Sequence, residues 1–80
     1  MAQQTLVPNT LSTVMKTVPL VTKLPMHQLR FDYDQEADVL YISIERPQKA
    51  TNSVLRDDGV LLRYHGKKLV GITVFEASKR

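Results

Sequence analysis

Four carboxylates stand at alternate positions near the middle of the chain, at Asp32, Asp34, Glu36 and Asp38. Oxygen-rich loops of this kind bind Ca²⁺ or Mg²⁺, and paired carboxylates also serve glycoside hydrolysis. A calcium-binding EF-hand loop starting at Asp32 would need Gly and Glu where this chain has Ala37 and Ser43. We therefore favour a polar turn in which Asp34 and Asp38 accept hydrogen bonds from nearby backbone N–H groups. Divalent-metal binding at this turn stays open as an alternative.

Other patterns that carry catalysis are missing from the sequence. His27 and His65 are the two histidines, and there is no cysteine, so the chain lacks a thiolate metal set and a His-x-x-x-His pair. Its serines lack a Gly-x-Ser-x-Gly context, and its glycines are too scattered for a phosphate-binding loop. We therefore predict that the protein is not an enzyme, and we assign no catalytic, cofactor-binding or metal-binding residue.

The acidic turn joins two of about five short strands, which a period-two alternation of apolar and polar residues predicts. These strands span residues 29–33, 39–45, 51–57, 60–65 and 69–77. Asp58-Gly59 predicts a hairpin with a type I′ turn, which needs two residues of positive φ. Every connection is too short for a parallel crossover, so the predicted fold is mainly β, an antiparallel meander. An α+β fold is the variant in which an N-terminal helix packs on the sheet.

Residues 1–28 differ in composition from the rest and are rich in Thr, Gln and Pro. Residues 9–18 predict a short helix with Asn9 or Thr10 as N-cap and an apolar stripe of Leu11, Val14, Met15 and Val18. Pro19 favours extended geometry for residues 18–25. We divide the chain into an N-terminal extension or arm, 1–28, and a small β-sheet domain, 29–80. The arm is expected to pack on the sheet or on a partner.

Length and composition indicate one domain with a thin core. The chain has 80 residues, of which 42% are hydrophobic and 24% charged, and it has no disulfide to stabilise it. In chains this small, apolar burial and conformational entropy nearly cancel, so a partner subunit is a favourable source of stability. The interrupted apolar residues of the first segment exclude a secretory signal, and no stretch of about 20 apolar residues spans a membrane. We expect a cytoplasmic protein.

The net charge of +3 raises nucleic-acid binding as a second alternative. Phosphate backbones favour clustered basic residues, whereas the basic residues here are spread singly, so this binding is expected to be weak. Its candidate residues are Arg30, Arg46, Lys49, Arg56, Arg63, Lys67 and Lys68.

The alternation also assigns side chains to faces of the sheet. The predicted core face contains Leu40, Ile42, Ile44, Val70, Ile72 and Val74. The opposite face is also partly apolar, and its apolar residues are Val39, Tyr41, Leu69 and Phe75. Two semi-apolar faces imply two covering layers, so we predict that this second set binds a protein partner or a second copy of the chain.

Three segments resemble the small bacterial domain of unknown function 2283 family. They are FDYDQEADVLYI at 31–42, DDGV at 57–60 and LVGITVFEAS at 69–78, and the resemblance covers about fifty residues. The chain departs from the family in its long N-terminal segment and in Thr73, where members often have an acidic residue. The resemblance implies a compact, mainly β domain without established catalytic activity. Such genes often lie near small toxin-like partners of the ribonuclease type, which implies an antitoxin-like role.

The leading hypothesis from the sequence is therefore a non-enzymatic protein-interaction module that acts as a homodimer or a heterodimer. An exposed edge strand would suit such a role, because it offers a template for strand addition by another chain.

Overall fold

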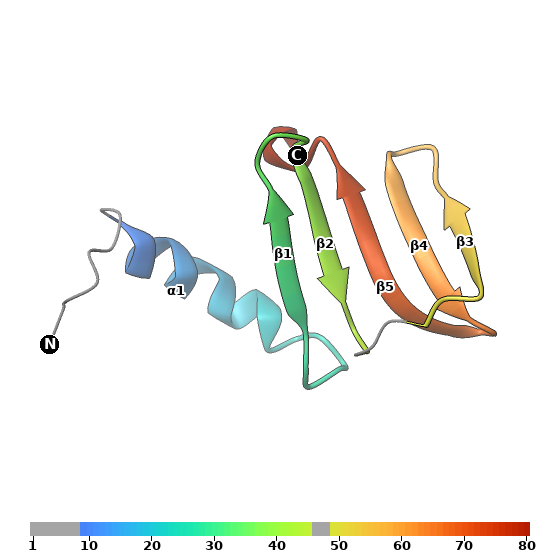
Figure 1. Cartoon of the computed structure of the whole chain (residues 1–80). Helices are drawn as coiled ribbons and strands as arrows, with labels where there is room; N and C mark the ends of the chain where they lie inside the picture. The colour runs from blue at the N-terminus through green and yellow to red at the C-terminus, as the bar shows by residue number, and fades with distance from the viewer. Residues whose placement is uncertain (1–8, 46–48) are drawn as a thin grey trace, which may run out of the picture.

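The protein forms one five-stranded antiparallel sheet with a helix outside it, in a computed structural model that describes residues 9–45 and 49–80 (Figure 1). The elements are α1 (Thr10–Val21), β1 (Arg30–Asp34), β2 (Val39–Ser43), β3 (Asn52–Leu55), β4 (Val60–His65), β5 (Lys68–Phe75) and the 3-10 helix η1 (Ala77–Lys79). The predicted fold class, mainly β with a short N-terminal helix, is confirmed.

The strands lie in the order β1-β2-β5-β4-β3, and every neighbouring pair is antiparallel. The sequential order of a simple meander is therefore wrong, because β2 pairs with β5 and not with β3. β5 is the longest strand and one of the most buried, so it gains from having a neighbour on each side. β3 is short and exposed throughout and begins with Asn52 and Ser53, which suits an edge position.

The hairpin between β3 and β4 is confirmed, but its predicted turn type is wrong. Gly59 has φ 79°, whereas Asp58 is not among the residues of positive φ, and a type I′ turn needs both. The Gly59 N–H donates to the Arg56 carbonyl at 3.2 Å, and the Arg56 N–H donates to the Val60 carbonyl at 2.8 Å. This pattern fits a type I turn followed by a left-handed glycine, which needs positive φ at one position only.

Helix α1 begins after Asn9, as predicted, but continues through Pro19 to Val21. The extended segment predicted for residues 18–25 is therefore wrong at its start. Proline removes one backbone donor, the N–H that would pair with the Met15 carbonyl one turn earlier. The Thr17 hydroxyl donates to the Val14 carbonyl and the Thr22 hydroxyl to the Pro19 carbonyl, so neither replaces that bond. Within the described ranges, α1 lacks the length and apolar run needed to cross a membrane.

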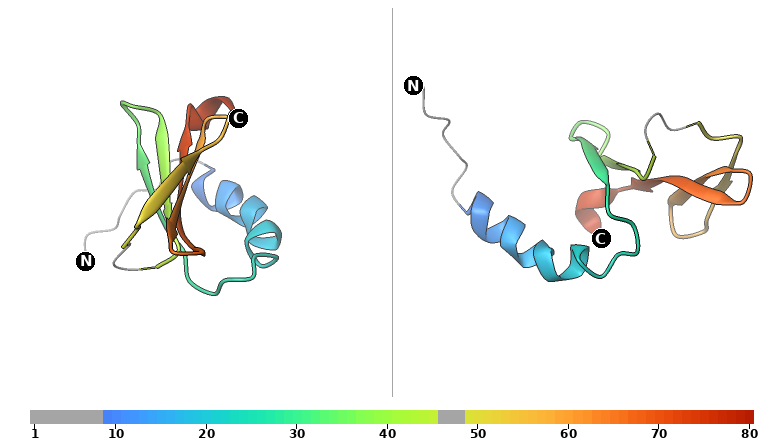
Figure 2. Two further views of the ribbon diagram at one scale, coloured as in Figure 1. Left: turned by 90° about the vertical axis from the view of Figure 1, so that its right-hand side faces the viewer. Right: turned by 90° about the horizontal axis from the view of Figure 1, so that it is seen from below.

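The core of the sheet is thin. Among the described residues, Val39 (5% exposed) and Val70 (0%) are the buried apolar side chains, and Thr73 is buried beside them. The predicted core face is thus wrong for the single chain, since of its six residues only Val70 is buried. Its other members are half-buried because the sheet is a single twisted layer, with α1 standing to one side and not on it (Figure 2). Of the two placements expected for the arm, on the sheet or on a partner, the first is not observed for α1.

Candidate interaction surface

Strand pairing gathers apolar side chains on one face of the sheet. Residues directly opposite each other in an antiparallel pair share a face, as do alternate residues along one strand. Phe31 pairs with Ile42, Ile42 with Ile72, and Ile72 with Leu62, so one row of apolar side chains crosses four strands. We call this surface the apolar face; it is formed by Phe31, Tyr33, Leu40, Ile42, Val54, Val60, Leu62, Ile72 and Val74. Asn52 and Tyr64 lie at its margin, on the same side of β3 and β4.

The apolar face is open where it reaches the edges of the sheet. Phe31 and Tyr33 on β1 are each 51% exposed, and Val54 on β3 is 49% exposed. The side chains between them are half-buried, shielded by their neighbours within the sheet. α1 has no buried residue, and the elements that pack closely on one another in the described chain are strands. Contiguous exposed apolar surfaces are typical of interaction sites.

The predicted partner-binding set lies mostly on the other side of the sheet, which we call the opposite face. Val39 pairs with Phe75, and Tyr41 pairs with Thr73 beside them, so three of the four predicted residues are together. Val39 is buried, whereas Tyr41 and Phe75 are accessible.

Leu69 is separated from this set by a β-bulge. The pairing of β4 with β5 shifts between Arg63 and Tyr64, so that Leu69 pairs with Tyr64 and Val70 is passed over. Tyr64 shares the face of Leu62, and the shift therefore brings Leu69 to the apolar side. A bulge of this kind changes the alternation at one residue, here Val70.

Asp38 connects the acidic turn to the C-terminal end of the chain. Its carboxylate accepts hydrogen bonds from the Tyr33 hydroxyl (2.6 Å), the Ser78 N–H (2.9 Å) and the Ser78 hydroxyl (2.8 Å). Its backbone carbonyl accepts from the Ala77 N–H at 3.0 Å, and its own φ is 55°. The sequence predicted a nearby backbone donor for Asp38. The donors to its carboxylate are instead the Tyr33 hydroxyl and Ser78, which is 40 residues further along the chain.

These hydrogen bonds shift the pKa values of both Asp38 and Tyr33. The bonds from Tyr33 and Ser78 hold the pKa of the Asp38 carboxyl below its ordinary value, since they stabilise the charged form. The same bond raises the pKa of the Tyr33 hydroxyl, because losing its proton would break it and place two negative charges together.

The remaining acidic residues of the turn have separate positions. Asp34 accepts a hydrogen bond from the Ala37 N–H at 3.1 Å, as the turn interpretation predicts. Asp32 forms an ion pair with Arg30 at 2.9 Å. No group of three or more His, Cys, Asp or Glu side chains able to hold a metal ion occurs in the described part of the chain. The four carboxylates are thus distributed among turn, strand and C-terminal contacts.

Several basic residues proposed for nucleic-acid contact are paired with acids. Arg30 pairs with Asp32, Arg56 with Asp58 at 3.1 Å, and Lys68 with Glu45. Arg46 lies outside the described residues.

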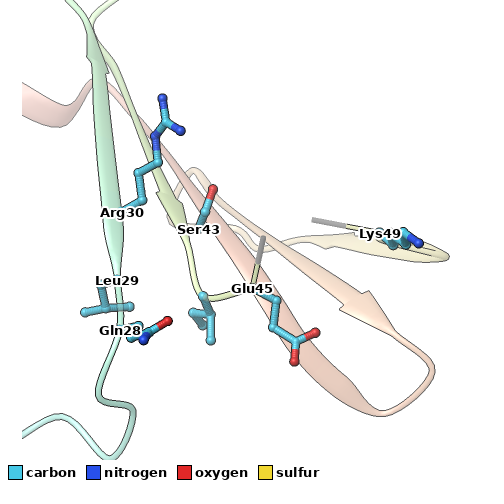
Figure 3. A pocket seen from close by; sticks show the side chains of 7 residues that line it. Gln28, Leu29, Arg30, Ser43, Glu45 and Lys49 are labelled. Atoms are coloured by element: carbon cyan, nitrogen blue, oxygen red, sulfur yellow. The ribbon is translucent and has the colours of Figure 1, made fainter. Parts of the chain in front are cut away.

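An open hollow of about 580 Å³ lies at one end of β1 and β2 (Figure 3). Its lining comes from the start of β1, the end of β2 and the segment before β3, and it combines Arg30 and Lys49 with Glu45. Opposite charges alternate here, whereas a phosphate-binding groove favours a clustered basic lining.

A comparison with protein-family models matches residues 30–78 to the family described as protein of unknown function (DUF2283). Comparisons with curated proteins and with solved structures gave no significant match. The matched region begins with β1 and ends at Ser78, so it contains all five strands and the contact between Asp38 and Ser78, and it leaves α1 outside. Because this region spans more than half of the sequence, the chain belongs to the DUF2283 family.

Proposed function

We propose that the protein is a non-enzymatic protein-interaction module that binds a protein partner across its apolar face. The observation that carries the proposal is the row of apolar side chains on all five strands, half exposed at both edges. Burying such side chains contributes about 25 cal/mol per Å² of apolar area, so a partner that covers the face gains a large part of its affinity there. The thin core gives the same interaction a role in stability.

The apolar face suits a partner better than the predicted set on the opposite face. On the opposite face Arg30, Asp32 and Arg63 stand among the apolar residues, and Val39 is already buried. Charged side chains are depleted from the centres of protein interfaces because their desolvation is costly. On the apolar face the remaining strand residues, Asn52 and Tyr64, are uncharged as well.

Two adjacent residues on β3 provide the test. Val54 is on the apolar face and Leu55 on the opposite face, and Leu55 is the more exposed of the two at 65%. Full-length wild type, Val54→Asn and Leu55→Asn would be chemically cross-linked in cells, and the cross-linked species compared. We expect Val54→Asn to lose a species that wild type and Leu55→Asn both retain. Equal behaviour of the two variants, or a wild type without any cross-linked species, would contradict the proposal.

Within this proposal, the finer role is that of an antitoxin-like member of a bacterial two-component pair. Co-expression with the product of the neighbouring reading frame tests it. Neutralisation of that product by wild type and by Leu55→Asn, but not by Val54→Asn, is the expected result. A product that is harmless without this chain, or that Val54→Asn neutralises equally well, would contradict the antitoxin role.

A further inference from the structure

Helix α1 carries a second uncovered apolar surface. Leu11, Val14, Met15, Val18 and Val21 recur at helical spacing and occupy an arc of about 120° around the helix axis. We call these five residues the helix stripe. They are between 40% and 67% exposed. Ser12, Lys16 and Pro19 lie on the other side of the helix, so neither the charge nor the proline interrupts the stripe.

We propose that the helix stripe of one chain docks on the apolar face of a second copy, and that the two copies exchange helices in a symmetric dimer. This inference rests on the proposed function, since it names the occupant of the same face. An exchange of identical elements lets each copy cover the other, so that one symmetric interface satisfies both helices and both sheets.

The dimensions of the two surfaces match. α1 has 12 residues, which corresponds to a length of about 18 Å. The five strands, spaced by about 4.8 Å, make the sheet about 19 Å wide between the axes of β1 and β3. A helix of this length can therefore lie across the apolar face without overhanging it, and with a diameter of about 10 Å it covers a band along that face. Since both surfaces consist mainly of aliphatic side chains, no charge has to be desolvated when they meet.

The accessible surface of the chain agrees with a missing partner. It amounts to 6863 Å², whereas a compact monomer of 9.1 kDa exposes about 4,900 Å². The difference is larger than the roughly 800 Å² that each partner of a standard interface buries, so the exposed helix stripe and apolar face leave enough area for a second copy to cover.

An intramolecular docking of α1 is the competing arrangement. In the structure the turn after α1, closed by the Lys23 N–H to the Leu20 carbonyl (3.2 Å) and the Leu24 N–H to the Val21 carbonyl (3.1 Å), is followed by residues 25–29, which lead into β1 and leave the helix clear of its own sheet (Figure 2). The helix stripe is exposed in this arrangement. A second copy can reach the stripe without any change in the chain, whereas docking on the same sheet would require residues 22–29 to take another path.

Sedimentation of the full-length protein over a wide range of concentrations tests the exchange. We expect wild type to be a dimer. Val14→Ser removes a stripe residue twice per dimer and should raise the dimer dissociation constant by about 100-fold. Leu20→Ser is the control, because Leu20 is also exposed (64%, against 51% for Val14) and lies on the side of α1 away from the stripe. Its dimer should stay at the wild-type affinity.

A second pair of variants identifies the surface that receives the helix. Phe31→Ser on the apolar face should weaken the dimer as Val14→Ser does, whereas Leu55→Ser on the opposite face should leave it intact. Mixing Val14→Ser with Phe31→Ser chains should restore association in part, because the mixed dimer retains one docking site in which both surfaces are wild type. Homodimers of either variant retain none.

The remaining outcomes overturn the exchange and say what replaces it. A monomeric wild type rejects it, and if the cross-linked species of the Val54 and Leu55 comparison persists, the proposed function stands with a different partner. A dimer that responds to Phe31→Ser but not to Val14→Ser indicates sheet-to-sheet packing. A dimer that responds to Val14→Ser alone indicates helix-to-helix packing. In each of these cases the apolar face of the second copy does not receive α1.

Discussion

Asp38 shows how one side chain can join distant parts of a small sheet. It lies between β1 and β2, and its carboxylate binds Ser78, which follows β5. The sequence identified Asp38 as a turn residue from its neighbours, because turn signals depend on residues close together in the sequence. Ser78 as its partner could not be predicted, because no periodicity connects two residues that are separated by four strands in the sequence. The segments FDYDQEADVLYI and LVGITVFEAS, noted separately in the sequence, thus meet at this contact.

Acid unfolding should report the Asp38 contact. Because the pKa of Asp38 is lower in the folded chain, its stabilising contribution is fully present above the unfolded value of about 3.9 and is lost as the pH falls through the folded value. We expect urea midpoints of wild type to fall across this acid range more steeply than those of Asp38→Asn, which should also be less stable at neutral pH. Glu36→Gln controls for the change in net charge. Equal acid sensitivity of wild type and Asp38→Asn would contradict the assignment.

Tyr33 should respond at the other end of the pH scale. Its raised pKa means that its contribution is present below the unfolded value of about 10 and is lost as the pH rises through the folded value. Subtracting the ultraviolet phenolate titration of Tyr33→Phe from that of wild type isolates this hydroxyl among the three tyrosines. The titration midpoint of Tyr33 should lie above the ordinary tyrosine pKa of about 10, and Asp38→Asn should lower it towards that value. A midpoint that ignores Asp38→Asn would refute the coupling.

At the scale of elements, alternation located the strands well and their neighbours poorly. The strand at residues 60–65 was predicted with its observed bounds, and the others to within about two residues at most ends. The strand order was not predictable from connection lengths alone. β2 can pair with β5 instead of β3, and every neighbouring pair still remains antiparallel. The expected helix end before Pro19 was wrong, because proline removes only one backbone hydrogen bond and α1 continues for two residues beyond it.

The two hairpin glycines allow backbone strain to be separated from side-chain contact. Gly59 (φ 79°) and Gly66 (φ 63°) both have left-handed backbones, so alanine should cost about 1–2 kcal/mol at either position. A Cβ at Gly59 would also lie 2.7 Å from Arg80 Nη2, whereas nothing lies within 4 Å at Gly66. Arg80 Nη2 donates to the Phe75 carbonyl at 2.7 Å and to the Gly59 carbonyl at 3.2 Å, and the alanine would disturb both bonds.

We therefore expect Gly59→Ala to lower the free energy of unfolding by about 1 kcal/mol more than Gly66→Ala does, measured by urea denaturation. The control is the same pair of substitutions in an Arg80→Ala background, where the difference should vanish. A difference that persists without Arg80 would place its cause in the turn itself.

At the scale of the whole molecule, the sequence predicted two apolar faces but not which residues one chain buries. Alternation separates Val39 from Leu40 without ranking them, and burial depends on which layer covers each face. With α1 off the sheet, Val39 is buried and Leu40 is half-buried. The prediction of a covering layer over each face stays a prediction, since the described part of the chain forms a single layer of strands.

A chain that gains its second layer from another copy should melt at a temperature that depends on concentration. Mass action then stabilises the folded dimer, and we expect the melting temperature to rise by about 3–5 °C for each tenfold increase in protein. Differential scanning calorimetry measures this dependence. The melting temperature of Val14→Ser should vary less with concentration at low protein concentrations, because this variant is already dissociated there. A melting temperature independent of concentration in wild type would contradict a dimer coupled to folding.

The pairing of β2 with β5 also determines the order in which strands can pair during synthesis on the ribosome. β1 and β2 can form their hairpin as soon as they emerge, but the second edge of β2 has no partner until β5 has been made, beyond β3 and β4. At ribosomal speeds of roughly 5–20 residues per second, that edge waits for about 2–6 seconds. During this interval the most apolar strand of the first hairpin is open to strands of other chains. The nascent protein is therefore most prone to aggregation after its first hairpin is complete and before its longest strand arrives.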